Sequence, residues 1–488
     1  MNDKTRIWAD RRIGVGSFDR MIFGHFIEHF HRQIYGGLFD PGSPFADDRG
    51  FRRDVIDAMR ELRTPIMRWP GGNFVSDYHW HEAVGPNRVA SYNKAWRVAE
   101  PNSFGTDEFI AWCREVGCAP YICTNGGNGT AEEMANWVEY CNGPHPTRYA
   151  NQRRENGHDE PFAVKYWGIG NESYGDWQIG AKTVAEWGPY VAESAKMMRR
   201  VDENIVLSAA AVPDSDWTMA LLKAAGRHLD LISIHGYWDH ISQVHEPADY
   251  LTAILNSGSP DRMIAAARSV IGAAGFDGKI RIAFDEWNLR AWHHPNGNHP
   301  DKIKARDLSD LPETYTMADA LFSAAFLNAC LRNCDIVAMA NMAPSVNTRG
   351  PLFVHAGGIV RRTTFHTLKM YVDHIRERIL STRVEGPEIR GEGASIAQVD
   401  ALVSADAAGT TVTLVNRDPA RPARCEVWLD GEVLTGARDA TILSGDSPDA
   451  FNSVDRPDAV TPLEAPMRDE QGAYVIPPHA LCMLHVPS

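Results

Sequence analysis

The sequence lacks the features that would indicate a nucleic-acid or membrane partner. It has no run of lysine and arginine, and its 49 basic residues stand against 63 acidic ones, which gives a net charge of −14. Nucleic acid and anionic membranes are therefore poor candidates as partners. No window approaches the roughly 18 consecutive apolar residues that a membrane-spanning helix needs. We expect a neutral or weakly charged small-molecule substrate, no nucleic acid and no membrane.

Cysteine is scarce and irregularly spaced. None of the eight cysteines forms a Cys-x-x-Cys pair, so they offer no thiolate metal site. The opening residues, Met1 to Trp8, are mostly polar and contain no apolar stretch that resembles a signal peptide. Without an export signal the cysteines are most simply reduced, buried thiols. We therefore expect a cytoplasmic location.

Strand-like and helix-like segments alternate regularly over residues 17–380. Such alternation implies parallel strands, and eight units suggest an α/β fold, a closed (β/α)8 TIM barrel that would form the catalytic domain. The expected strands are Met21–Glu28, Pro65–Trp69, Ala119–Thr124, Val164–Ile169, Ile205–Ala210, Leu229–Tyr237, Lys279–Glu286 and Asp335–Met342. The expected helices are Arg52–Leu62, Thr106–Val116, Ala131–Cys141, Thr183–Val201, Trp217–Leu229, Pro247–Ile271, Thr314–Arg332 and Thr363–Arg376.

The pattern changes after residue 380. Ala397–Ser404, Thr410–Val415 and Cys425–Leu429 alternate apolar and polar residues, and turns rich in Gly, Pro and Asp separate such runs. This alternation predicts antiparallel strands in a C-terminal β-sandwich of jelly-roll type. We assign this domain to residues 381–488, joined by an N-terminal strand at residues 5–16.

Two of the predicted barrel strands end in a glutamate. Val164–Ile169 leads into Asn171 and Glu172, and the seventh strand ends at Glu286. Catalytic groups of such barrels come from the carboxyl ends of different strands, so the two acids could face one site. Hydrolysis of a glycosidic bond needs one acid that donates a proton and a second, ionised acid. Asn171 could bind a ring hydroxyl. The alternative is a polar strand end that only begins a loop.

Other strand ends carry polar groups that suit the same chemistry. Arg68 could lower the pKa of the ionised acid, or it could be a structural ion-pair partner inside the barrel. Tyr237 could hold the attacking carboxylate in line, or it could belong to the core. Gly71 and Gly72 would let the backbone approach closely and free Asn73 to reach a hydroxyl.

Two further sets of residues are expected to have no catalytic part. Asp285 precedes Glu286 on an extended strand, so it should point to the opposite side and be structural. His25, His29 and His31 lie close together in sequence, but a metal site usually needs a third or fourth ligand at a defined spacing. We therefore expect no metal.

At these positions the sequence resembles glycoside hydrolase family 51, which consists chiefly of α-L-arabinofuranosidases. The resemblance extends in order over nearly the whole chain. Its motifs are Gly24-His-Phe-Ile-Glu28, Arg68-Trp-Pro-Gly-Gly-Asn-Phe74, Trp137–Asn142, Lys165–Glu172 with Tyr174–Trp177, Ser233-Ile-His235 and Phe284-Asp-Glu-Trp-Asn288.

The resemblance implies a retaining double displacement without a cofactor, with Glu172 as acid/base and Glu286 as nucleophile. It places Arg68 under the nucleophile. The residues that match positions binding the arabinofuranosyl ring or orienting the nucleophile are Glu28, Asn73, Asn171 and Tyr237. The family is typically cytoplasmic and oligomeric, which implies a homo-oligomer, a hexamer or trimer. The implied activity is exo-acting removal of terminal non-reducing α-L-arabinofuranosyl residues from arabino-oligosaccharides.

Several stretches depart from the family pattern. Asn73 stands where many members have Cys, Arg362 stands where members often have a Gln that contacts the sugar, and the loops 342–358 and 79–86 differ. The loop from Trp292 to Thr314 would shape the leaving-group side or be a plain surface excursion. These departures leave open another furanosidase, a β-D-xylosidase or an endoglucanase. Two further alternatives are a sugar-binding protein with a silent barrel and a metal-dependent hydrolase.

Overall fold

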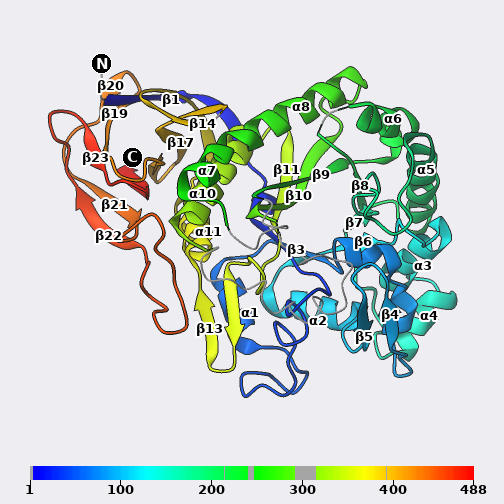
Figure 1. Cartoon of the computed structure of the whole chain (residues 1–488). Helices are drawn as coiled ribbons and strands as arrows, with labels where there is room; N and C mark the ends of the chain where they lie inside the picture. The colour runs from blue at the N-terminus through cyan, green and yellow to red at the C-terminus, as the bar shows by residue number, and fades with distance from the viewer. Residues whose placement is uncertain (1–3, 214, 240–246, 292–314, 392) are drawn as a thin grey trace.

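The larger part of the molecule is a closed barrel of parallel strands. The computed structural model describes residues 4–213, 215–239, 247–291, 315–391 and 393–488 (Figure 1). Eight strands pair in the order β10-β11-β2-β3-β6-β7-β8-β9, all in parallel, so their carboxyl ends meet at one rim. They are β2 (Gly24–Phe26), β3 (Ile66–Trp69), β6 (Ala119–Thr124), β7 (Tyr166–Ile169), β8 (Val206–Ala210), β9 (Leu231–Asp239), β10 (Arg281–Arg290) and β11 (Val337–Met342). The predicted TIM barrel is confirmed.

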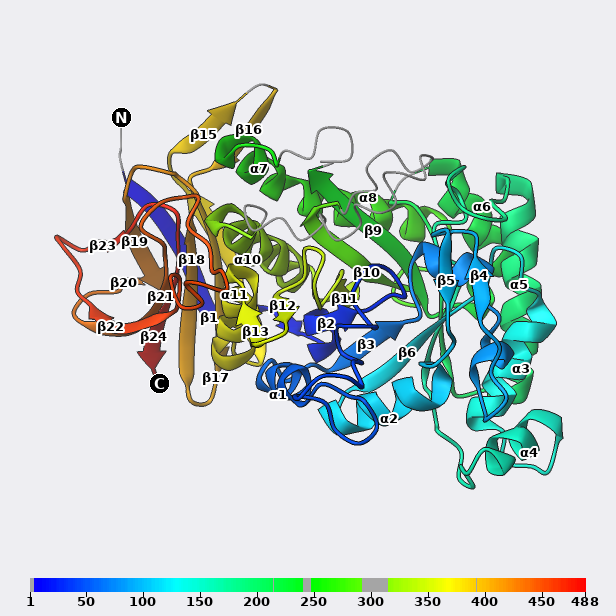
Figure 2. The same ribbon diagram turned by 60° about the horizontal axis from the view of Figure 1, so that its bottom comes forward.

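Helices cover the outside of the barrel, as the amphipathic segments predict (Figures 1 and 2). They are α1 (Arg53–Glu61), α2 (Thr106–Val116), α3 (Ala131–Asn142), α5 (Val184–Val201), α6 (Ser215–Ala225), α7 (Tyr250–Leu255), α8 (Ser259–Ala273), α10 (Met317–Arg332) and α11 (Thr363–His374). Among the described residues, no helix combines the length and the apolar character needed to cross a membrane.

One predicted helix, Pro247–Ile271, is broken in the structure. A short 3-10 turn, Asn256–Gly258, separates α7 from α8. Pro260 lies in the first turn of α8. Because proline has no backbone N–H and its ring clashes with the preceding turn, it favours the beginning of a new helix over the continuation of an old one. The sequence also gave no sign of α4 (Arg148–Glu155), whose residues are mostly polar.

The C-terminal part is a ten-stranded sheet in which the opening strand β1 (Lys4–Ser17) also takes part. Its path is β20-β19-β1-β14-β17-β18-β24-β21-β22, with β23 paired to β19. The remaining bounds are β14 (Arg378–Glu385), β17 (Val399–Asp406), β18 (Gly409–Asn416), β19 (Ala423–Leu429), β20 (Glu432–Val433), β21 (Arg438–Leu443), β22 (Leu463–Met467), β23 (Tyr474–Ile476) and β24 (Ala480–Pro487).

The sheet folds over its own apolar face. Cys425 of β19 and Ala440 of β21, which lie near opposite ends of the path, belong to one buried cluster together with Val412 of β18. Two layers packed over a shared core are what the alternating sequence pattern predicts. The other face of the sheet contacts α10 and α11, so the domain lies directly against the barrel (Figure 2).

Candidate active site

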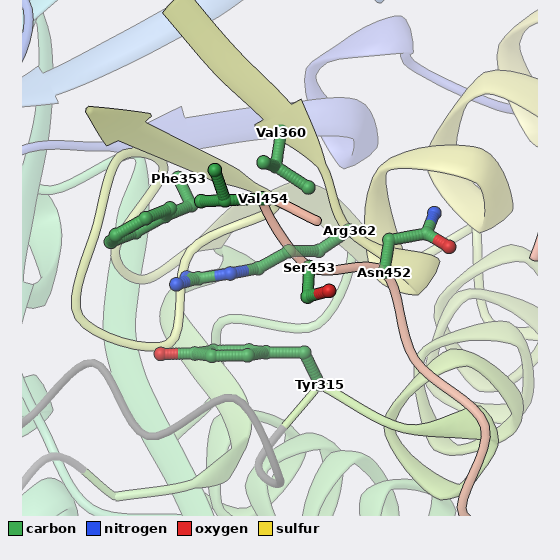
Figure 3. Close-up of a pocket in the computed structure, with 7 residues that line it drawn as sticks. All are labelled: Tyr315, Phe353, Val360, Arg362, Asn452, Ser453 and Val454. Carbon is green, nitrogen blue, oxygen red and sulfur yellow. The ribbon is translucent and has the colours of Figure 1, made fainter. Parts of the chain in front are cut away.

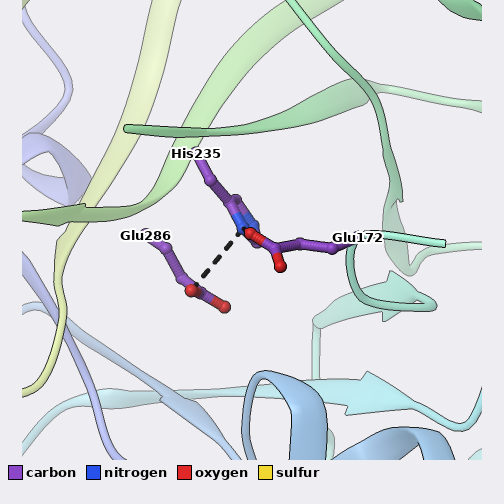
Figure 4. Close-up of side chains that lie close together, drawn as sticks. All are labelled: Glu172, His235 and Glu286. Atoms are coloured by element: carbon purple, nitrogen blue, oxygen red, sulfur yellow. Dashed lines mark hydrogen bonds and ion pairs between the residues drawn. The ribbon is translucent and has the colours of Figure 1, made fainter. Parts of the chain in front are cut away.

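Glu172, which follows β7, and Glu286 of β10 face each other, and His235 of β9 lies beside both (Figure 4). One carboxylate oxygen of each glutamate and one ring nitrogen of His235 all lie within 4.8 Å of one another. His235 Nδ1 is 2.9 Å from Glu172 Oε1 and 3.5 Å from Glu286 Oε2. The fold therefore brings together two acids that are far apart in sequence.

The backbone turns sharply where β7 ends, and this turn presents Glu172. Gly170 has φ +68°, in the left-handed region, and a Cβ there would lie 2.6 Å from the Trp187 ring. Glu172 itself has φ +42°, which is unusual for a residue with a side chain. A side chain held in such a conformation by its surroundings is typical of functional sites.

Both oxygens of Glu172 accept hydrogen bonds. His235 donates to Oε1, while Trp177 Nε1 at 2.9 Å and Gln178 Nε2 at 3.3 Å donate to Oε2. Burial acts to raise the pKa of Glu172, but the hydrogen bond and charge of His235, with those two donors, hold the pKa below its usual value. Glu172 is therefore ionised in this arrangement.

Glu286 is held by two buried donors inside the barrel. Arg68 Nη1 is 2.5 Å from Oε1, and the Tyr237 hydroxyl donates to Oε2 at 2.9 Å. Arg68 Nη2 also donates to Asn171 Oδ1 at 2.8 Å. The guanidinium thus joins the two strand ends that carry the acids, and both Arg68 and Tyr237 touch the carboxylate that the sequence analysis assigned to them.

The prediction that Asp285 points away from Glu286 is wrong. Ala283 of β10 pairs with Ser233, and the next paired residue, Glu286, is opposite His235. Three steps along β10 therefore match two along β9, which is a β-bulge. The extra residue breaks the alternation of side chains, and Asp285 turns into the barrel together with Glu286.

Asp285 is fully buried among donors. Its carboxylate accepts from the Tyr121 hydroxyl at 2.6 Å and from Ser233 Oγ at 2.5 Å. Arg68 Nε lies 3.4 Å from Oδ2, and His235 Nε2 lies 3.4 Å from Oδ1. Although burial acts to raise the pKa of Asp285, the charge of Arg68 and the bonds from His235 and Ser233 lower it to about 2. Asp285 is a buried carboxylate in contact with the groups around both glutamates.

Glu28 follows β2 and is completely buried. Its Oε1 accepts from the Phe74 backbone N–H at 2.8 Å and from Trp96 Nε1 at 2.6 Å. A Cβ on Gly71 or Gly72 would lie 2.7 Å from an atom of the Glu28 side chain, so the two glycines make room for Glu28. Burial and the charge of Glu286 raise the pKa of Glu28 to about 8. Within the described residues, Glu28 Oε2 has no hydrogen-bond partner.

Asn73 lies close to the residues that follow β7. Its Oδ1 accepts from Gln178 Nε2, and Asn171 Nδ2 lies 3.5 Å from the same oxygen. Gln178 in turn accepts from Ser76 Oγ at 2.9 Å. A network of amides therefore connects Asn73 to Glu172 through Gln178.

His25 and His29, two of the three neighbouring histidines, have different partners. His25 Nδ1 is 3.1 Å from Ser345 Oγ, while His29 lies 3.1 Å from Glu100 and accepts from Trp69. In the described part of the chain, the one group of His, Cys and acidic side chains with metal-like spacing is Glu172, His235 and Glu286. The guanidinium of Arg68 already bonds Glu286, and its charge would repel a cation there. These residues fit a hydrogen-bonded acid pair better than a metal site.

Arg362 packs where the barrel meets the C-terminal domain (Figure 3). It borders a pocket of about 60 Å³ together with Tyr315, Phe353, Val360, Asn452, Ser453 and Val454. Its guanidinium carbon is 3.2 Å from the centre of the Tyr315 ring and 5.1 Å from that of Phe353. Its Nη1 donates to the Gly350 carbonyl at 2.9 Å. The loop from Trp292 to Thr314, expected to shape the leaving-group side, lies outside the described residues.

Several groups that contact the acids escaped the sequence analysis. His235 ends the motif Ser233-Ile-His235 near the end of a predicted strand, and this position could have marked it as a functional residue. Trp177 also stood in a quoted motif, but nothing showed that its indole reaches Glu172. Gln178 and Trp96 gave no signal, because their contacts depend on loops that fold back onto the rim.

Comparisons with known proteins point to a single family. Residues 58–250 match the family model described as alpha-L-arabinofuranosidase 1 domain, and residues 285–480 match that of the alpha-L-arabinofuranosidase C-terminal domain. The chain is 35% identical to alpha-L-arabinofuranosidase C of Emericella nidulans, over 98% of this chain and 96% of that protein. It is 36% identical to the intracellular exo-alpha-(1->5)-L-arabinofuranosidase 1 of Bacillus subtilis, over 73% and 72%.

A solved structure shows the same architecture throughout. The crystal structure of the alpha-L-arabinofuranosidase from Thermotoga maritima, an arabinose complex, aligns with a TM-score of 0.89 and 32% identity, over 99% of this chain and all of that one. The fold, the facing acids and these similarities define the protein as a glycoside hydrolase. The chain belongs to glycoside hydrolase family 51, the family of the α-L-arabinofuranosidases.

Proposed function

We propose that the chain is a retaining, exo-acting α-L-arabinofuranosidase that removes terminal non-reducing α-L-arabinofuranosyl residues from oligosaccharides. The observation that carries the mechanism is the spacing of the acids, since an oxygen of Glu172 and an oxygen of Glu286 lie within 4.8 Å of each other. Retaining glycosidases hold their carboxyl groups roughly 5 Å apart, whereas inverting ones need a wider gap for a water molecule. The short spacing supports direct attack by a carboxylate.

In the first step, Glu286 attacks the anomeric carbon while Glu172 gives its proton to the glycosidic oxygen. The glycosidic bond breaks, a glycosyl ester forms on Glu286, and the alcohol leaves. Arg68 and Tyr237 hold the attacking carboxylate in line.

Glu172 must take up a proton before this step. A glycosidic oxygen that approaches Glu172 Oε2 displaces the donors Trp177 and Gln178 from it. Loss of two hydrogen bonds to the ionised form, together with the negative charge of Glu286 nearby, favours protonation of Glu172. The arrangement in the free protein corresponds to the second step, in which ionised Glu172 takes a proton from water and that water releases the sugar from Glu286.

Ring hydroxyls have several partners at the rim. Glu28 and Asn73 stand beside the acids, and Asn171 is fixed by Arg68. A buried carboxyl whose pKa is about 8 can donate as well as accept, which suits a hydroxyl that needs both. We assign the furanosyl ring to these three side chains.

The setting of the enzyme is also part of the proposal. The Bacillus subtilis relative is named as intracellular and exo-acting on α-(1→5) linkages, and we extend both properties to this chain. A cytoplasmic enzyme would meet small arabino-oligosaccharides rather than polymer. We further propose a homo-oligomer, a hexamer or trimer, which light scattering on the purified protein would establish.

A substrate panel tests the activity. The purified enzyme should release nitrophenol from the α-L-arabinofuranoside and much more slowly from β-D-xylopyranoside, β-D-glucopyranoside and other furanosides. It should shorten arabino-oligosaccharides one residue at a time from the non-reducing end. A preference for a pyranoside would assign the site to another activity of the family. Absence of turnover on every furanoside would support a sugar-binding protein with a silent barrel.

A further inference from the structure

A line of contacts connects Asp285 of β10 to Glu172, which follows β7. Asp285 Oδ1 lies 3.4 Å from His235 Nε2, and His235 Nδ1 lies 2.9 Å from Glu172 Oε1. Ser233 Oγ is 3.3 Å from the same Nε2 and donates to Asp285. The imidazole therefore bridges a buried carboxylate and Glu172 with its two nitrogens.

The surroundings of His235 are dominated by acids. Glu172 faces it from the end of β7, and Asp285 and Glu286 face it from β10. The charged or titratable groups one contact further away are Arg68 of β3 and Tyr121 of β6, which touch Asp285, and Tyr237 of β9, which touches Glu286. Burial acts to lower the pKa of His235, but the charge of Glu286 and the bonds to Asp285 and Glu172 raise it to about 10. His235 is therefore an imidazolium that donates from both nitrogens.

We propose that Asp285 is a positioning residue that keeps both nitrogens of His235 protonated. In this state Nδ1–H donates to Glu172 Oε1 in both steps of the reaction, and the proton that Glu172 exchanges with the substrate is confined to Oε2. The proposal rests on the proposed function, because it assigns a means of control to the same acid/base.

The alternative state shows why the second proton matters. A neutral imidazole has one N–H and one acceptor nitrogen. If Nδ1 became the acceptor, it would attract the proton of Glu172 to Oε1, on the side away from the leaving oxygen. An anion next to Nε2 favours the doubly protonated ring, in which Nδ1 cannot accept, and the bulge in β10 supplies that anion in Asp285. Ser233 and Arg68 in turn hold Asp285 ionised and in place.

Asp285→Asn tests the proposal, because it keeps the shape of the side chain and removes its charge. We expect kcat/KM to fall on the order of 100-fold for arabinofuranosides with poor leaving groups and less than about tenfold for the dinitrophenyl arabinofuranoside, since good leaving groups need little proton donation. Tyr121→Phe is the matched control. It removes one hydrogen bond to Asp285 but leaves the charge of Asp285 in place, so the dependence on the leaving group should stay that of the wild type.

A spectroscopic measurement separates this role from a merely structural one. With ¹⁵N-labelled histidine, the His235 ring should show imidazolium shifts in the wild type at about pH 8, below its pKa of about 10, and neutral shifts in Asp285→Asn. The signal is assigned by its loss in His235→Gln. His235→Gln, in which Asp285 is intact, should show the same leaving-group dependence as Asp285→Asn. In the double variant kcat/KM should fall no further than in the worse single variant.

The outcomes are distinct. A loss that is equal for all leaving groups, an imidazolium signal retained in Asp285→Asn, or additive losses in the double variant would each overturn the proposal. If Asp285→Asn does not fold, a His235→Gln enzyme with the wild-type leaving-group dependence would also overturn it. A wild-type enzyme that turns over no arabinofuranoside would instead refute the proposed function.

Discussion

The two glutamates of the site lie in contrasting surroundings. Glu286 is within a long strand and is only 2% exposed, and its donors Arg68 and Tyr237 come from the barrel itself. Glu172 stands just after its strand with φ +42°, and its donor Trp177 is 60% exposed. Arg68 and Tyr237 hold Glu286 from within the barrel, whereas one of the donors to Glu172 is an exposed indole at the rim.

This difference matches what a double displacement demands. The nucleophile needs the same ionised state in every cycle, so rigid, buried donors suit it. The acid/base must gain and lose a proton in each cycle, so it needs hydrogen bonds that a substrate can displace. Substitutions on the two sides of this contrast should therefore differ in their effects.

Glu286→Ala should have the largest effect. Without the attacking carboxylate no glycosyl ester forms, and kcat should fall by roughly 10⁴-fold or more for every substrate, whatever its leaving group. Steady-state assays with the nitrophenyl and dinitrophenyl arabinofuranosides would measure this. A loss confined to poor leaving groups would mean that Glu286 is the proton donor instead.

Glu172→Ala should have a large effect that depends on the substrate. The loss should be roughly 10²- to 10⁴-fold for poor leaving groups and smaller for the dinitrophenyl substrate, because only the former need a proton. Azide should restore turnover by attacking the glycosyl ester, and the azide product should have the retained configuration. An azide product of inverted configuration would show that no covalent intermediate exists.

Tyr237→Phe removes a buried donor from the nucleophile and should lower kcat less than the two glutamate substitutions do. One charge-assisted hydrogen bond to Glu286 is lost, which corresponds to about 10- to 100-fold in kcat. The leaving-group dependence should be unchanged, since the acid is untouched. A kcat of Tyr237→Phe equal to or above that of the wild type would place Tyr237 in the core rather than in the site.

Trp177→Phe removes an exposed donor from the acid/base and should have the smallest effect, less than about tenfold in kcat. The indole stabilises ionised Glu172, so its loss raises the pKa of Glu172. Because kcat/KM requires the protonated acid, the alkaline limb of its pH profile should move to higher pH, by less than about one unit. A shift of this limb to lower pH would mean that the indole stabilises the protonated form of Glu172 instead.

The barrel and its acids could be predicted from sequence because their signals are local and repeated. Apolar strands alternate with amphipathic helices, and polar residues recur at the strand ends, so Glu172 and Glu286 stood out without any knowledge of contacts. The break between α7 and α8 was missed, although the polar run Asn256–Asp261, with Gly258 and Pro260, marked it.

Asp285 shows why the remaining details could not be predicted. Strand alternation places it opposite to Glu286, and a bulge that depends on pairing with β9 reverses this. Similarly, the Gly71-Gly72 pair indicated close backbone approach, but the group that approaches is Glu28, from another strand end. Non-local pairing decides both cases, and a single sequence does not record it.

The configuration of the first product tests the central claim most directly. Proton NMR during hydrolysis of the nitrophenyl α-L-arabinofuranoside should show the α-anomer of arabinofuranose first, before mutarotation. Two inversions at the anomeric carbon, by Glu286 and then by water, restore the original configuration. Initial appearance of the β-anomer would mean a single displacement by water, and the assignment of Glu286 as a nucleophile would be wrong.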